Sequence, residues 1–376
     1  MQFHPTGMIW PPSVHGVLVT EGVRGEGGIL KNSRGERFMF NYIPPAYKND
    51  VASTEEEANS WVAGDRNNNR KPPELLTRDV VARAILAEVK ADRGSDHGGA
   101  YLDIASVRDA DYIKRKLPSM HHQFLKLADV DITKQPMEVG PTAHYSMGGV
   151  RVNPETTESS VGGLFAAGEV AAGLHGANRL GGNSLSDLLV FGKRAGEYAA
   201  ESAREKKEAE SISKEEIMSS IEESLAPFKN APQGESPYAL QMELKEAMGS
   251  YCGIIRSGDE IKKVLDKIEE IREKGKRLVI PQGLDLNSAW HAALDLRSLL
   301  TVSELLATAA FERQESRGAH TRDDFPKASQ EWGRCNVVLK KGGDGKIQTR
   351  REPLEEMQKR LRKIIDELLI HQKIKE

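Results

Sequence analysis

Cysteine is scarce in this chain, which has two among 376 residues. Cys252 and Cys335 lie far apart, and neither belongs to a C-x-x-C pair. Structural zinc and iron–sulfur sites use clustered cysteines, so we expect no metal site in this chain. Two unclustered cysteines are also typical of a protein whose thiols stay reduced.

Three further absences narrow the class of protein. No uninterrupted run of about 18 apolar residues is present, so the sequence predicts no membrane-spanning helix. The net charge of -3 creates no field that would attract nucleic acid. The G-x-G-x-x-G loop that binds dinucleotide phosphates is also missing. What remains is an ordinary globular composition, 38% hydrophobic and 29% charged, with length enough for two or three domains.

The first part of the chain mixes short strands with irregular segments. Residues 4–140 combine β-like runs, such as 16–19 and 28–31, with loops rich in proline, asparagine and glycine. One helix is predicted over 78–87, where apolar residues recur at helical spacing and Thr77 is placed as the N-cap.

The later parts are more helical. Residues 142–200 predict a strand, a turn, a second strand and a helix, and residues 212–320 are mostly helical. A period of about 3.6 residues is present in 240–248, 261–273 and 290–311, which indicates an antiparallel bundle. The last part predicts a charged hairpin around 342–345 and a polar helix from Leu354.

The stretch 173–192, GLHGANRLGGNSLSDLLVFG, is the centre of the functional interpretation. Arg179 is held in a loop of small residues, which lets backbone approach a ligand, and a helix is predicted behind Asn183 and Ser184 as N-caps. This layout presents N–H groups and a cation to a flat anion. A short buried strand at 163–167 precedes it and leads to Glu169, as in loops that bind a dinucleotide ribose.

Four other clusters combine cations and hydroxyls with few carboxylates. They are HPTG at His4 to Gly7, TEGVRGEGG at Thr20 to Gly28, TRD at Thr77 to Asp79, and TAHYSMGG at Thr142 to Gly149. Such groups suit a small dicarboxylate dianion. We expect His144 and Arg179 to bind one carboxylate, and His4 with Thr20 to bind the other.

The same residues also have structural interpretations. A single histidine more often satisfies a structural hydrogen bond, and Glu21 beside Arg24 is equally well read as a surface pair. Arg78 is different, because a cation in the first turn of a helix opposes the helix dipole. A salt bridge from Arg78 to Asp79 or Glu74 explains it poorly, which favours a functional role.

In this order, the motifs HPTG, TEGVRGEGG, TRD, TAHYSMGG, GLFAAGE and GLHGANRLGGNSLSDLLVFG closely resemble the flavoprotein subunit of succinate dehydrogenase and fumarate reductase. ESRGAH at Glu315 to His320 also matches that family, and the likeness runs from His4 to about Trp332. It implies a multi-domain α+β fold. The implied parts are a capping domain at 1–140, the C-terminal part of an α/β FAD-binding domain at 141–205, a helical bundle domain at 206–322 and a C-terminal segment at 323–376.

The resemblance implies the FAD-dependent oxidation of succinate to fumarate, or the reverse, with hydride transfer to or from flavin N5. Arg78 would be the proton donor and acceptor, with Glu21 and Arg24 as its relay to solvent. The implied substrate-binding residues are His4, Thr20, His144 and Arg179. The implied cofactor-binding residues are Glu169, toward the ribityl or ribose hydroxyls, and Asn183, Ser184 and Leu185, toward the isoalloxazine.

The resemblance also implies partners. Electrons would pass to a separate iron–sulfur subunit that docks on membrane-anchor subunits, which places the chain on the cytoplasmic face of the membrane as a peripheral protein. The family's amino-terminal flavin-domain half, with its glycine-rich loop, is not found in these residues. We therefore expect a fragment with an incomplete FAD site that is inactive alone.

Two alternatives stay open at this point. L-aspartate oxidase has similar HPT, RGEG and HGANRL motifs, although Met147 stands where that family is expected to have cysteine. The other alternative is a truncated, non-catalytic product that cannot retain flavin.

Overall fold

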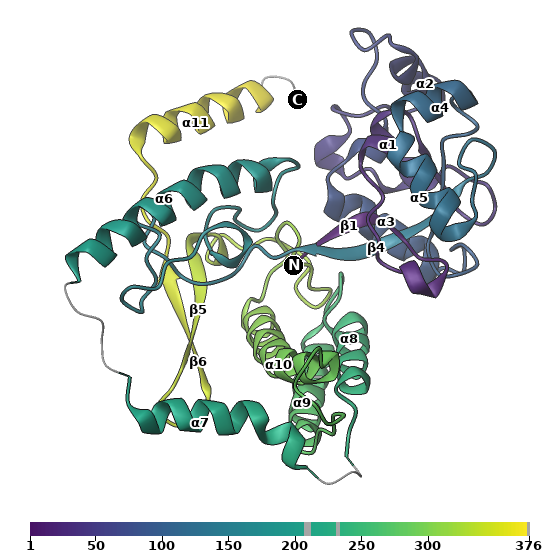
Figure 1. The fold of residues 1–376 in the computed structure, drawn as a ribbon. Helices are drawn as coiled ribbons and strands as arrows, with labels where there is room; N and C mark the ends of the chain where they lie inside the picture. The colour runs from purple at the N-terminus through teal and green to yellow at the C-terminus, as the bar shows by residue number, and fades with distance from the viewer. Residues whose placement is uncertain (207–211, 231–233, 374–376) are drawn as a thin grey trace. The chain divides into compact units, whose positions relative to one another are not determined.

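The computed structural model describes residues 1–206, 212–230 and 234–373. The chain divides into two compact units, Met1–Ser211 with Gly318–His320 and Ile212–Arg317 with Thr321–Glu376. Figure 1 shows helices and strands in both units, which confirms the predicted multi-domain α+β fold. The finer division into four segments stays a prediction.

A four-stranded antiparallel sheet organises the first unit. Its order is β1 (Gln2–Met8), β4 (Met137–Tyr145), β3 (Ala100–Asp103) and β2 (Ile29–Lys31). The pairing of β1 with β4 shifts register between Gln2 and Phe3 and again between His4 and Gly7. Such irregularities re-aim side chains and are frequent beside active sites. β2 confirms the run predicted at 28–31. Residues 16–19 form no strand, although Leu18 makes an isolated bridge with Gly7.

Helix α3 (Arg78–Lys90) packs against this sheet, close to β1 in Figure 1. Its buried residues, such as Val81 and Ile85, share a hydrophobic core with Leu102 of β3 and Met137 of β4. Thr77 is the N-cap, as predicted, although its side chain makes no capping hydrogen bond. The other helices of this part are α1 (Gly22–Gly25), α2 (Glu55–Ala63), α4 (Ala110–Lys116) and α5 (Pro118–Ala128), with short 3-10 turns η1 (Pro12–Val14), η2 (Phe38–Tyr42), η3 (Pro45–Tyr47) and η4 (Pro73–Leu75).

The strand predicted at 163–167 is absent. Phe165 pairs with Glu158 only as an isolated bridge, and the segment is only partly buried, with Ala166 buried but Leu164 52% exposed. A strand needs a neighbour of similar length for its backbone groups, and the described residues of this unit offer none there. The 3-10 turn η5 (Gly168–Val170) follows directly and carries Glu169.

Helix α6 (Asn183–Glu205) confirms the predicted helix but not its predicted caps. The N-cap is Gly182, which has φ of 82°, a left-handed conformation that favours glycine. Asn183 is therefore the first residue inside the helix, and neither its side chain nor that of Ser184 caps it. The oxygen of Ser184 instead lies 3.5 Å from Nη1 of Arg179.

The second unit contains the predicted bundle and hairpin. Helices α8 (Pro237–Tyr251), α9 (Gly258–Gly275) and α10 (Ser288–Glu312) pack around a core that includes Leu244, Ile268 and Leu296. Helix α7 (Lys214–Leu225) and the turn η6 (Ala226–Lys229) come before them, and the turn η7 (Trp332–Arg334) comes after. The predicted hairpin is β5 (Cys335–Lys341) with β6 (Ile347–Pro353). The terminal helix α11 (Lys359–Lys373) begins later than the predicted Leu354, because β6 continues to Pro353.

A close approach at Gly99 provides a test of the packing of the first unit. A Cβ atom at this position would lie 2.2 Å from the backbone oxygen of Val139 and 2.5 Å from Cδ1 of Ile9. Overpacking of this kind costs about 1–3 kcal/mol, so we expect Gly99→Ala to lower the free energy of unfolding by that amount in urea denaturation. Gly162→Ala is the control, because a Cβ there meets no atom within 4 Å. Equal stability of the two variants would contradict this packing.

Candidate active site

Arg78 is the first residue of α3 and forms an ion pair with Glu21. Its Nε and Nη2 each lie 3.2 Å from Oε2 of Glu21, and 15% of its side chain is exposed. Asp79 pairs with Arg83 instead, at 2.9 Å. Glu74 is bound by Arg37 at 2.7 Å. Neither of the two structural partners considered for Arg78 is therefore its partner here.

Arg24 extends this chain of charges into the interior. Its Nη2 lies 4.0 Å from Oε2 of Glu21, and its Nη1 donates to the backbone oxygen of Glu74 at 2.5 Å. The pKa of Arg24 is lowered to about 10. Burial is the main cause and the charge of Arg78 adds to it, whereas the charge of Glu21 acts in the opposite direction. The Nε and Nη2 atoms make no hydrogen bond within the described residues. A buried cation with unused donors is costly, which suits a functional group better than a structural one.

His4 and His144 lie on the neighbouring strands β1 and β4. Their ring centroids are 5.4 Å apart, with an angle of 64° between the ring planes. Burial first, and then Arg24 and Arg78, lower the pKa of His4 to about 3. Burial, Arg78 and Arg179 also lower the pKa of His144. Both rings are therefore neutral near pH 7 and act as hydrogen-bonding groups rather than as cations.

Arg179 is 4% exposed and lies over an aromatic ring. Its Cζ is 4.6 Å from the centroid of the Tyr145 ring, and its Nε makes no hydrogen bond within the described residues. The hydroxyl of Tyr145 lies 3.2 Å from Nε2 of His175 and 3.4 Å from Oδ2 of Asp187, a residue of α6. This polar cluster fixes the ring against which the guanidinium rests.

Gln2, which the sequence motifs do not include, connects Arg78 and Arg179. Its Oε1 accepts a hydrogen bond from Nη1 of Arg78 at 3.3 Å and another from Nη2 of Arg179 at 3.1 Å. The positions are 76 and 177 residues away from Gln2, so the fold brings three distant segments together. The sequence could have pointed to Gln2 through its position two residues before His4, since side chains two apart in a strand tend to share a face.

The remaining candidates are less closely connected. Oγ1 of the exposed Thr20 accepts from the backbone N–H of Gly22 at 3.3 Å. Oε1 of Glu169 accepts from the backbone N–H of Ser146 at 2.8 Å. Asn183 and Leu185 are exposed in the first turn of α6. Of the predicted substrate residues, the structure thus places His4, His144 and Arg179 near Arg78, whereas no contact connects Thr20 with them.

The loop before α6 has features that fit one wall of a flavin site. Gly173, Gly176 and Gly182 have φ of 105°, 55° and 82°, and a Cβ on any of them would meet no atom within 4 Å. Leu180 and Leu185 are each 67% exposed, so apolar surface lies beside open backbone. A flat, largely apolar ring system with polar edges matches such a surface. The loop supplies a wall only, because no phosphate-binding glycine loop accompanies it in this chain.

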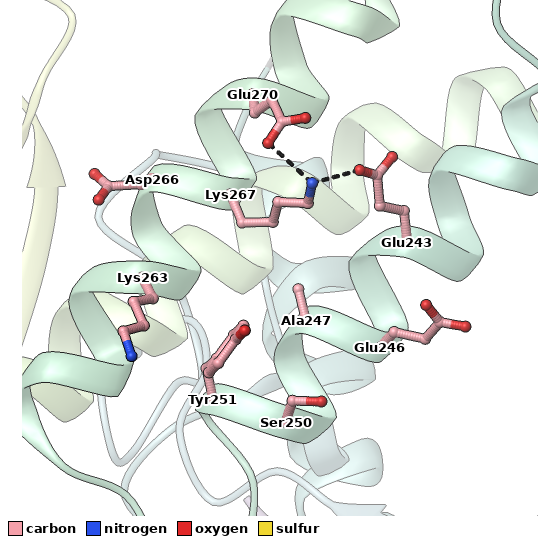
Figure 2. A pocket seen from close by; sticks show the side chains of 9 residues that line it. All are labelled: Glu243, Glu246, Ala247, Ser250, Tyr251, Lys263, Asp266, Lys267 and Glu270. Carbon is pink, nitrogen blue, oxygen red and sulfur yellow. Dashed lines mark hydrogen bonds and ion pairs between the residues drawn. The ribbon is translucent and has the colours of Figure 1, made fainter.

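The second unit has a surface groove between α8 and α9, shown in Figure 2. Nζ of Lys267 contacts Glu243 at 2.6 Å and Glu270 at 2.9 Å. Lys274 contacts the same two carboxylates at 2.8 and 2.7 Å. These pairs neutralise one another at the surface. Glu246, Lys263 and Asp266 also line the groove, so its charge is of mixed sign and does not favour one class of ligand.

Within 1–206, 212–230 and 234–373, no group of three or more His, Cys, Asp or Glu side chains is arranged to hold a metal ion. In the same part of the chain, none of the helices combines the length and the apolar character that crossing a bilayer requires.

Two family models match the chain in sequence order. Residues 1–185 match the model described as an FAD binding domain, and residues 241–364 match the model described as fumarate reductase flavoprotein C-term. A subunit of the fumarate reductase (CoM/CoB) of Methanothermobacter marburgensis is 43% identical over 343 residues, which cover 91% of this chain and 56% of that protein.

Solved structures of similarly named proteins also match the chain. The structure of Mycobacterium smegmatis Sdh1 in complex with UQ1 matches with a TM-score of 0.74 at 48% identity. The match covers 95% of this chain and 55% of the Sdh1 chain. A quinol-fumarate reductase with menaquinol molecules has a TM-score of 0.80 at 32% identity and covers 95% and 59%. The chain spans about half the length of the curated relatives it matches. The predicted resemblance is confirmed, and the chain belongs to the family of the flavoprotein subunits of succinate dehydrogenase and fumarate reductase.

Proposed function

We propose that this protein catalyses the FAD-dependent oxidation of succinate to fumarate, or the reverse reaction. One observation carries the proposal: the guanidiniums of Arg78 and Arg179 converge on Oε1 of Gln2, beside the neutral rings of His4 and His144. Two fixed cations and two neutral donors suit a small dianion. The relatives reported above, named as fumarate reductase and succinate dehydrogenase proteins, support the same chemistry.

Substrate binding follows from the charges. Arg179 and His144 would hold one carboxylate, and His4 with Thr20 the other. Because His4 and His144 are neutral, the charge of the dianion is compensated by the arginines. In the direction of fumarate reduction, a hydride adds to a carbon of a molecule that is already negative. The fixed donors stabilise the electron density that develops on the carboxylates in that step.

Proton transfer would use Arg78. It donates a proton to one carbon of fumarate, or removes one from succinate. An arginine has a very high intrinsic pKa, so this role requires a connected carboxylate that restores its proton. Glu21 is in contact at 3.2 Å and is 45% exposed at its side chain, which connects the pair to solvent. Arg24 is the next member of this relay.

FAD, when bound, supplies the acceptor or donor of the hydride at its N5 atom. We place Glu169 and the first turn of α6, with Asn183, Ser184 and Leu185, along its ribityl chain and ring system. The exposed apolar surface and open backbone of this loop support that assignment. Because the chain has no G-x-G-x-x-G loop, we expect these 376 residues alone to retain FAD weakly and to be inactive.

Electron transfer to an iron–sulfur subunit that is carried by membrane-anchor subunits completes the proposal. The names of several relatives, which describe flavoprotein subunits, support membership in a complex. Through these partners the protein would lie at the inner face of the cell membrane.

The proposal is tested first by ligand binding, which does not require the cofactor. We expect succinate to raise the thermal unfolding temperature of the protein, whereas butyrate, with the same number of carbons and one carboxylate, has little effect. In the complete enzyme loaded with FAD, succinate and L-aspartate are then compared as substrates with a dye acceptor. Oxidation of aspartate alone would assign the protein to the L-aspartate oxidases, and equal binding of succinate and butyrate would argue against a dicarboxylate site.

The low pKa of His4 gives a pH-dependent prediction. The unfolded histidine takes up a proton below about pH 6.5, whereas folded His4, with a pKa of about 3, does not. The unfolded state then binds more protons, so stability falls as the pH falls. Between pH 7 and pH 5 we expect His4 to contribute a loss of about 2 kcal/mol in the free energy of unfolding, which His4→Gln removes. Urea denaturation at both pH values measures this; the same pH dependence in both proteins would contradict the burial of a neutral ring.

A further inference from the structure

We propose that Gln2 is a positioning residue that makes the site specific for a dianion, because its neutral carboxamide holds Arg78 and Arg179 together without neutralising either. This inference rests on the proposed function, since it concerns the same two guanidiniums. It assigns a role to a residue that does not itself carry charge or transfer a proton.

The orientation of the Gln2 carboxamide is fixed by four contacts. Its Nε2 donates to Oδ1 of Asn178 at 2.5 Å and to the backbone oxygen of Arg179 at 2.7 Å. Its Oε1 accepts from Arg78 at 3.3 Å and from Arg179 at 3.1 Å. A flipped amide would turn its N–H donors toward two cations and its oxygen toward two acceptors. The side chain is also buried, with 1% of the residue exposed.

The amide end of Gln2 is anchored to the helix that carries Arg78. Nδ2 of Asn178 donates to Oδ1 of Asp79 at 3.1 Å, and Asp79 is held by Arg83 at 2.9 Å. Gln2 therefore joins β1, the start of α3 and the loop before α6. A shift of any one of these segments changes the separation of the two guanidiniums.

The charge of the two arginines is only partly compensated within the protein. Glu21 pairs with Arg78, but Arg179 forms no ion pair among the described residues. Both guanidiniums contact the same oxygen of Gln2, and burial, followed by the nearby charge of Arg78, lowers the pKa of Arg179. A carboxylate at position 2 would compensate the positive charge of the two arginines within the protein. The neutral amide of Gln2 does not, so a carboxylate of the ligand can compensate it.

Gln2→Glu tests this directly, because it keeps the shape of the side chain and adds one negative charge. Its second carboxylate oxygen replaces Nε2 and faces two acceptors, so the readout is the response to succinate in the complete FAD-loaded enzyme rather than the unfolding temperature without ligand. The stabilisation produced by succinate should be lost, and KM for succinate should rise roughly 10- to 100-fold, as expected when charge-assisted contacts to the ligand are neutralised. A purely structural glutamine would give a different pattern: the stabilisation by succinate and the KM for succinate would stay close to those of the wild type.

Gln2→Met provides the second variant, in case the buried charge prevents folding. It has similar length but cannot accept the two hydrogen bonds, so the guanidiniums lose their common acceptor. We expect a larger fall in kcat than rise in KM. Gln123→Glu is the matched control, because this residue lies in the same unit and its amide donates to Leu18; it should leave succinate binding unchanged.

The outcomes separate this inference from the proposed function. If succinate does not stabilise the wild-type protein, the proposed dicarboxylate site is wrong, and with it the inference about Gln2. If succinate stabilises the wild type and Gln2→Glu to the same extent, with similar KM, only the role of Gln2 is overturned. Unchanged kcat and KM in Gln2→Met would overturn it as well.

Discussion

In the complete FAD-loaded enzyme, replacing Arg78 by lysine or glutamine is expected to lower kcat about 100- to 10,000-fold, the range that a positioned proton donor contributes, while succinate still binds. The structure explains why lysine is no substitute. Arg78 uses Nε and Nη2 toward Glu21 and Nη1 toward Gln2 at the same time. A lysine ammonium is a single point of charge and cannot span both partners. Steady-state kinetics and equilibrium binding of succinate separate the loss of proton transfer from a loss of affinity.

The position of Arg78 makes the interpretation of this experiment direct. Its proposed proton partner Glu21 is in contact, whereas Glu74 and Asp79 are occupied by other arginines. Arg93→Lys is the matched control, since Arg93 also uses Nε and Nη2, toward Glu88 of the same helix, and takes no part in the contacts of Gln2. We expect near-normal turnover in the control. Substantial activity in Arg78→Gln would move the acid to another residue of the site.

The site could be predicted from the sequence where its chemistry is local. Arg78 stood out because a cation at a helix start opposes the dipole, and α3 does begin at that residue. The helical periods at 240–248, 261–273 and 290–311 all lie within helices of the bundle. In each case the signal and the structure depend on residues three or four positions apart.

What could not be predicted depends on contacts between distant segments. Gln2 is neutral and lies outside the HPTG motif, so only its contacts with Arg78 and Arg179 reveal a role. The strand expected at 163–167 failed for a related reason: an apolar run becomes a strand only beside another strand, and the described residues around Leu164 supply only a bridge. Helix caps also depend on backbone conformation, and at α6 the left-handed Gly182 took the place expected for Asn183.

The polar cluster that supports the ring beneath the Arg179 guanidinium could not be predicted from a linear motif either. Tyr145 and Asp187 belong to β4 and α6, and each has an ordinary structural interpretation in its own segment. Together with His175 they hold the aromatic ring on which the guanidinium rests. The motif TAHYSMGG drew attention to His144 rather than to the tyrosine beside it.

The largest loss of affinity is expected from Arg179→Ala. Removing a buried partner of a charged ligand costs about 2–5 kcal/mol, which corresponds to a roughly 30- to 4,000-fold rise in the dissociation constant for succinate. Arg179 is 4% exposed, rests on the Tyr145 ring and forms no ion pair among the described residues, so its charge is available to a ligand. Isothermal titration calorimetry with succinate measures the change.

Arg194→Ala is the matched control for this experiment. Arg194 also places its guanidinium over an aromatic ring, that of Phe191 at 5.5 Å, but it lies farther along α6 with a more exposed side chain. If losing a cation–π contact were enough to weaken succinate binding, the dissociation constant would rise in both variants. If Arg179 contacts the ligand, the dissociation constant rises only in Arg179→Ala. Unchanged affinity in Arg179→Ala would mean that the dicarboxylate binds elsewhere, because among the contacts of the described residues no other cation shares the Gln2 carboxamide oxygen with Arg78.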